Sequence, residues 1–195
     1  MKWSMWSIAV GIGVAGSVAT ARAQVSALPR PVRIGISGGA SLPVGNFSNG
    51  AKTGFNVSGM VMVKPITMPT AIRLEVQYQR FDEKNGVFNT PGGVVPATGT
   101  FSTIGGIVNL MYYLDVQAAV KPYIAGGFGY YHFKVRRSGS GLSGSASENR
   151  FGYNLGAGLE FGLGRVSTFL EADWQGILTS LKANNMVPLR FGITL

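Results

Sequence analysis

Cysteine is absent from this 195-residue chain, and histidine occurs only once. Without cysteine there can be no disulfide, no thiolate metal site and no lipid-modified cysteine at a processed N-terminus. A single histidine likewise excludes a metal site built on a histidine cluster. We therefore expect neither a metal nor another cofactor.

Charge and long apolar runs are also scarce. Charged residues make up 13% of the chain, about half the share in soluble domains. Beyond the first two dozen residues, no run of about 18 apolar residues offers a transmembrane helix. Glycine, by contrast, accounts for 29 residues, about twice the usual share. A glycine-rich chain that is poor in charge and lacks apolar helices indicates a sheet structure.

The N-terminus has the pattern of an export signal. Met1 and Lys2 give a positive start, an apolar run follows from Trp3 to Val18, and residues 21–23 read Ala-Arg-Ala. Small residues in this spacing are read by signal peptidase, so we expect cleavage before Gln24. An uncleaved membrane anchor is the alternative. The sequence thus predicts a signal peptide at residues 1–23 and one domain at residues 24–195.

The mature domain would be basic. Removing Lys2 and Arg22 from the 17 bases leaves 15 against 8 acids, a net charge of +7. An exported protein does not meet nucleic acid, and the bases are scattered rather than clustered. An anionic membrane surface is the better partner.

Alternating segments of about ten residues recur along the mature chain, the length of a tilted strand that crosses a bilayer. We expect eight such strands, at residues 31–41, 54–63, 71–81, 101–113, 122–135, 150–162, 166–178 and 187–195. Long loops are expected at residues 42–50, 82–100 and 136–149, after strands one, three and five. Shorter turns follow strands two, four and six. This parity is typical of transmembrane barrels, whose long loops lie outside the cell.

The faces of four expected strands separate cleanly into apolar and polar sides. In the third strand Ile72 and Leu74 alternate with Arg73 and Glu75, and strands six to eight behave similarly. A barrel in lipid places the apolar face outward, whereas a soluble lipid-carrying barrel reverses it. Mid-strand charges and many glycines on the polar face favour a packed lumen and a lipid-facing exterior. Aromatic residues near the strand ends, Tyr113, Tyr123 and Tyr131 among them, are expected to form two interfacial belts.

Three segments carry a resemblance to a known family. They are residues 34–47 (IGISGGASLPVGNF), the pair 122–131 (PYIAGGFGYY) and 151–161 (FGYNLGAGLEF), and the final residues 191–195 (FGITL). The chain resembles the small eight-stranded outer-membrane barrels of Gram-negative bacteria, such as the membrane domain of OmpA and the OmpX/Ail group. The resemblance implies an all-β, antiparallel up-and-down barrel in the bacterial outer membrane. It also implies recognition of the C-terminal strand by the barrel-assembly machinery, although Leu195 replaces the family's usual terminal aromatic residue.

Charges on the polar faces predict a network of ion pairs that fills the lumen. Strands one and eight must meet, so Arg33, Arg190 and Glu171 are expected to lie close together. An eight-stranded barrel has room for side chains but not for an aqueous pore, which argues against a porin. The full expected network is Arg33, Arg73, Glu75, Glu160, Glu171, Asp173 and Arg190.

A second set of bases belongs to the expected outer rim and loops, where it could contact lipopolysaccharide phosphates or another acidic surface. The set comprises Lys52, Lys84, Arg136, Arg137 and Lys182. These residues and the long loops favour a non-enzymatic structural or surface-interaction role.

The alternative is a lipid A-modifying enzyme, an acyltransferase or deacylase. His132 is the only candidate base, and its strand parity is expected to place it on the lumen side with Tyr130 and Lys134. No serine signature accompanies it.

Overall fold

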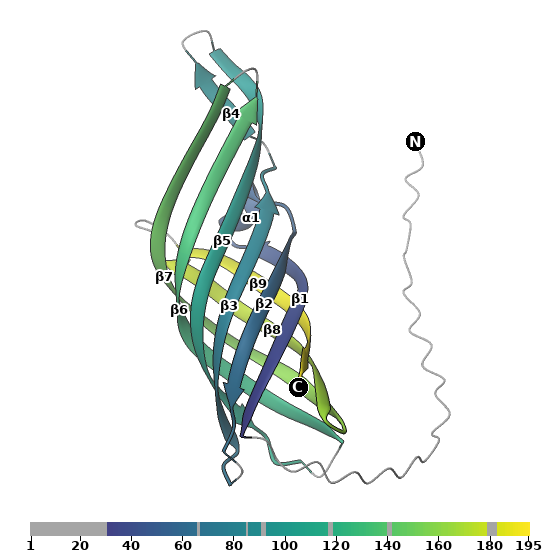
Figure 1. Cartoon of the computed structure of the whole chain (residues 1–195). Coiled ribbons are helices and arrows are strands. Elements are labelled where there is room, and N and C mark those ends of the chain that lie inside the picture. The colour runs from purple at the N-terminus through teal and green to yellow at the C-terminus, as the bar shows by residue number, and fades with distance from the viewer. Residues whose placement is uncertain are drawn as a thin grey trace, which may run out of the picture.

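Eight antiparallel strands close into a barrel in the computed structural model (Figure 1). The structure describes residues 31–65, 67–84, 86–90, 93–116, 119–139, 142–178 and 183–195. The barrel strands are β1 (Val32–Val44), β2 (Gly54–Val63), β3 (Thr70–Asp82), β5 (Gly93–Tyr113), β6 (Val120–Gly139), β7 (Leu142–Leu163), β8 (Val166–Leu178) and β9 (Ala183–Thr194). A short strand β4 (Gly86–Thr90) pairs with β5, and one helical turn, α1 (Phe47–Gly50), follows β1. The expected signal peptide and Lys182 lie outside the described residues.

The barrel is closed by two pairings. Strand β1 pairs with β2 on one side and with β9 on the other, so the first and last strands meet. Strand β3 pairs with β5 from Thr70 opposite Tyr112 to Asp82 opposite Thr100, which joins the two ends of the sheet. The all-β, up-and-down fold expected from the sequence is confirmed. Within the described residues, no helix is long and apolar enough to cross a membrane.

The two ends of the barrel differ. We call the end with the connections after β2, β5 and β7 the turn end, and the end with α1, β4 and the β6–β7 connection the hairpin end. At the hairpin end, β5, β6 and β7 continue beyond the barrel with β4 and form a projecting sheet, seen at the top of Figure 1. This projecting sheet comprises residues 86–90, 93–99, 136–139 and 142–151.

Two of the loops expected from the sequence are mostly strand. Residues 136–139 and 142–149, rich in serine and glycine, continue β6 and β7 in register up to Gly139 opposite Leu142. Residues 82–100 likewise contain β4 and the first part of β5. Serine and glycine have low strand propensity, but backbone pairing between the two long strands outweighs it. The prediction of long irregular loops here was therefore wrong.

Burial alternates along each strand as expected, with apolar side chains outward. Phe128 on the outer wall is 77% exposed, whereas Arg73 in the lumen is 0% exposed. Glycines on the inner face make room for large lumen side chains. A Cβ at Gly105, Gly129 or Gly152 would lie within 2.7 Å of the Tyr131 ring. The lumen is therefore a packed core rather than a channel.

The strand parity of β6 differs from the expectation for His132. Tyr131 and Phe133 are buried in the lumen, whereas Tyr130 and His132 are exposed on the outer wall. The prediction of a lumen-facing His132 was wrong, because aromatic residues occupy both faces of β6 and hide its alternation. Tyr113, Tyr123 and Tyr131, which we expected in the interfacial belts, are buried in the lumen instead.

Candidate functional site: the lumen network and the hairpin end

The centre of the lumen holds two arginines among three carboxylates. Arg73 donates from both terminal nitrogens to Glu171, at 2.7 Å each, and its Nε lies 3.3 Å from Glu75. Arg190 forms ion pairs with Glu75, Glu171 and Asp173. All five side chains are almost fully buried. The bidentate geometry is the strongest form of arginine–carboxylate pairing, and the cluster links β3, β8 and β9.

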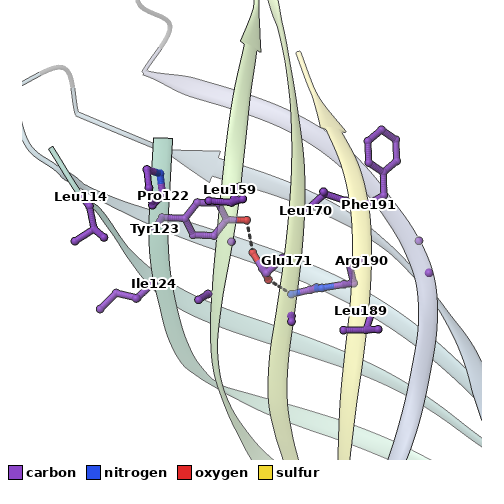
Figure 2. A pocket seen from close by; sticks show the side chains of 15 residues that line it. Leu114, Pro122, Tyr123, Ile124, Leu159, Leu170, Glu171, Leu189, Arg190 and Phe191 are labelled. Atoms are coloured by element: carbon purple, nitrogen blue, oxygen red, sulfur yellow. Dashed lines mark hydrogen bonds and ion pairs between the residues drawn. The ribbon is translucent and has the colours of Figure 1, made fainter. Parts of the chain in front are cut away.

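Figure 2 shows part of this cluster from the side, with Tyr123 and Arg190 converging on Glu171. The Tyr123 hydroxyl donates to Glu171 over 2.6 Å. On the other side of the wall lies an apolar hollow of about 650 Å³, whose lining includes Leu159, Leu170 and Leu189. The barrel wall, which is one strand thick, thus separates the buried charges from the apolar exterior.

Arg33 occupies a separate position from this cluster. It donates to Glu160 at 2.7 Å and to the Tyr113 hydroxyl at 3.3 Å, and Tyr113 in turn donates to Glu160 at 2.7 Å. Among the described residues, Arg33 has no ion pair with Glu171. The structure therefore brings Arg190 and Glu171 together but not Arg33, because Arg190 lies opposite Gly39 on β1, six residues along that strand from Arg33.

A layer of uncharged polar side chains covers the cluster. Gln79 donates to Gln77 at 2.7 Å and to Gln175 at 2.6 Å, and Gln175 donates to Tyr131 at 2.6 Å. Ser41 donates to Gln79 at 3.0 Å. Each of these amides is buried, so the hydrogen bonds satisfy groups that would otherwise be costly to bury.

An apolar plug lies above the amide layer. The Phe47 ring from α1 packs edge-on against Phe81 at 5.1 Å and against Phe101 at 5.7 Å between ring centres. Ile177 and Met186 are fully buried beside them. The hairpin end of the lumen is thus filled by the one helical turn of the described chain, which argues against solute conduction.

The expected rim bases have different surroundings. The Nε of Arg137 donates to both carboxylate oxygens of Glu83, at 2.9 and 3.1 Å. This hydrogen bonding raises the pKa of Arg137. Lys84 donates to the Ser48 carbonyl at 2.7 Å, and Lys52 is exposed beside α1. Arg136 lies on β6 and points outward. Arg136 and Arg137 therefore belong to the projecting sheet rather than to a loop.

His132 lies on the outer wall beside Asn149. Its Nδ1 lies 2.8 Å from the Asn149 side-chain oxygen. Among the described residues, no serine or carboxylate is hydrogen-bonded to the ring. No group of acidic or histidine side chains in the described chain could hold a metal ion.

Three buried tyrosines complete the lumen network and were assigned elsewhere from the sequence. Tyr113 and Tyr123 donate to carboxylates and Tyr131 accepts from Gln175. For Tyr123 and Tyr131 a signal was available, because the residues between them on the same face of β6 are the small Ala125, Gly127 and Gly129. Glycine at positions 105, 129 and 152 is the spatial counterpart of Tyr131.

A closed antiparallel barrel with an apolar outer wall and a charged, plugged lumen defines a transmembrane β-barrel protein. A family model described as "Outer membrane protein beta-barrel domain" matches residues 10–192. The chain belongs to this family of outer-membrane proteins.

Solved structures share the fold at low sequence identity. A major outer membrane protein from Thermus thermophilus matches with a TM-score of 0.61 and 12% identity, covering 85% of this chain and 99% of that one. Neisserial surface protein A matches with a TM-score of 0.58 and 14% identity, covering 85% and 97%. No curated protein matches the sequence. These likenesses show the fold alone, and a fold does not define an activity.

Proposed function

We propose that this protein is a non-enzymatic outer-membrane anchor that holds the projecting sheet outside the cell for contact with a surface partner. The observation that carries the proposal is the unpaired edge of β7. Pairing of β7 with β8 begins at Gly152, so residues 143–149 pair with β6 alone among the described residues. Such an edge presents a row of free backbone N–H and C=O groups.

The partner that fits this edge is an extended segment of another protein, added as a further strand. Backbone hydrogen bonds would supply affinity, and alternate side chains would supply specificity. Residues 143–147 read Ser-Gly-Ser-Ala-Ser, small side chains that leave the backbone accessible. The packed barrel beneath gives this edge a rigid base.

The proposed orientation places the hairpin end outside and both ends of the barrel chain, near Arg33 and Leu195, in the periplasm. It is supported by the short connections at the turn end, such as Gly164–Arg165. Export through a signal peptide cleaved before Gln24 is part of the proposal. So is assembly through β9, whose outward residues Leu189, Phe191, Ile193 and Leu195 alternate with buried ones.

Site-specific photo-crosslinking on intact cells tests the interaction. A photoreactive residue at Ser145 lies on the open edge, and one at Arg165 in the β7–β8 turn is the matched control. We expect protease-sensitive adducts of discrete mass from position 145 and none from position 165. Equal yields at the two positions, or none at either, would remove the interaction role.

Lipid analysis tests the non-enzymatic part separately. Cells that express the protein, the His132→Ala variant or no protein should have the same lipid A acylation pattern. A pattern that changes with the protein and reverts with His132→Ala would restore the enzyme alternative.

A further inference from the structure

Three bases gather on the outer wall at the hairpin end. The register places Arg80, Ser102 and Lys134 in one row across β3, β5 and β6, all on the outward face. Arg136 lies one step further along β6, in the row of Thr100. From strand spacing, Arg80 and Lys134 are about 10 Å apart, and Lys134 and Arg136 about 7 Å. The three cations thus surround two hydroxyl side chains.

These cations have no partner within the described chain. None of Arg80, Lys134 and Arg136 forms a hydrogen bond or ion pair with another described residue through its side chain. Asp82 is the one acidic side chain on this stretch of outer wall among the described residues. It pairs with Thr100, and Arg136 pairs with Thr100 from the other side. The patch therefore has a net charge of +2.

Its surroundings change in order along the barrel axis. The next outward row towards the turn end holds Tyr78 and His132, and Tyr130 follows one row further, in edge contact with Phe151 at 5.0 Å. The Phe55 ring lies 6.0 Å from that of Tyr78, and Phe55 pairs with Arg80 in the row of the patch itself. Such rings mark the boundary between hydrocarbon and headgroups. Directly above lies a polar hollow of about 380 Å³ beside Arg136, whose hydroxyl lining comes from Thr98, Thr100, Ser138, Ser143 and Ser145.

We propose that this outer-wall patch binds one phosphorylated glycolipid of the outer leaflet, with its phosphate between Arg80, Lys134 and Arg136 and its sugar in the hydroxyl-lined hollow. Acyl chains would run down the apolar wall below the aromatic rings. Guanidinium, ammonium and hydroxyl groups are the donors that phosphate oxygens accept, and hydroxyls of the hollow match those of a sugar. Only the placement in the outer leaflet rests on the proposed orientation.

Native mass spectrometry of the detergent-solubilised barrel measures the binding directly. The probes are bisphosphorylated lipid A, the same lipid after phosphate removal, and phosphatidylglycerol. The test variant is Arg80→Gln/Lys134→Gln/Arg136→Gln. The control variant, Lys64→Gln/Lys121→Gln/Arg165→Gln, removes the same charge at the turn end. A heat-modifiability gel shows that each variant keeps a closed barrel.

We expect each removed charge at the patch to weaken lipid A binding about fivefold, so the triple variant loses on the order of 100-fold. The control should bind as the wild type does, and dephosphorylated lipid A and phosphatidylglycerol should both bind more weakly than lipid A. The proposal is overturned if the triple variant keeps its affinity or if the control loses as much. If phosphatidylglycerol bound as tightly as lipid A, the proposal that the hollow binds the sugar would be refuted. These outcomes do not depend on which end of the barrel faces outward, so they separate this proposal from the crosslinking test.

Discussion

Replacing Arg190 by Met should destabilise the barrel far more than replacing any single carboxylate around it. Arg190 contacts Glu75, Glu171 and Asp173, and Arg73 contacts only the first two. Without Arg190, three buried carboxylates share one cation, and Asp173 keeps none among the described residues. Removing one partner of a buried ion pair costs about 3–5 kcal/mol, since the remaining charge is left without compensation.

Glu171→Gln provides the comparison. It replaces one of the two oxygens that accept from Arg73 by an amide nitrogen, but it leaves two cations facing two carboxylates, so the charges balance. We expect a smaller loss of stability, about 1–3 kcal/mol, from the weakened hydrogen bonds. Arg165→Met, in the exposed β7–β8 turn, serves as a control for loss of positive charge and should leave the unfolding curve unchanged.

The measurement is urea unfolding in lipid vesicles, followed by tryptophan fluorescence and by the band shift on unboiled gels. Two results would refute the reasoning. If the Arg190→Met variant and the Arg165→Met control unfold at the same urea concentration, the cluster does not stabilise the barrel. If Glu171→Gln costs more than Arg190→Met, the excess of negative charge does not govern the energetics.

Three further predictions use other features. Phe47→Ala should lower the free energy of unfolding by about 3–5 kcal/mol through loss of the apolar plug, yet vesicle swelling should show no solute flux because the amide and charge layers remain. Gly156→Ala should destabilise by about 1–3 kcal/mol, because its Cβ would lie 2.1 Å from Asp173, whereas Gly59→Ala, with open space around it, should not; urea unfolding compares the two. Because the chain has no native cysteine, Ser145→Cys should react with an impermeant maleimide on intact cells, and Arg165→Cys should react only after permeabilisation; the reverse pattern would invert the proposed orientation.

The sequence predicted the barrel well where charge and apolar residues alternate. Arg73 and Glu75 fall between Ile72 and Leu74, and that alternation alone assigned their face. It failed in β6, where Tyr130 and Tyr131 are chemically alike but face opposite sides, so His132 was placed on the wrong face. Only the pairing of β6 with its neighbours resolves that parity.

The contacts within the lumen could be predicted only in part. That Glu171 and Arg190 would meet follows from β8 and β9 being neighbours. That Arg33 lies beside Glu160 depends on strand tilt and stagger, which residue order does not contain. The projecting sheet was missed because residues 136–149 have the composition of a loop, and the strand conformation of residues 136–139 and 142–149 depends on backbone pairing between neighbouring strands.

The buried ion pairs also constrain how this chain can reach its folded state. Arg73 and Glu171 are 98 residues apart in sequence, and Arg33 and Glu160 are 127 apart. Neither pair can form until the last strands arrive, so the stabilisation comes late in assembly. A slip of one residue in any pairing would turn that strand's charges towards hydrocarbon and its leucines into the lumen. The ion pairs therefore stabilise only a barrel that has closed in the correct register. A barrel with a shifted strand lacks these central contacts.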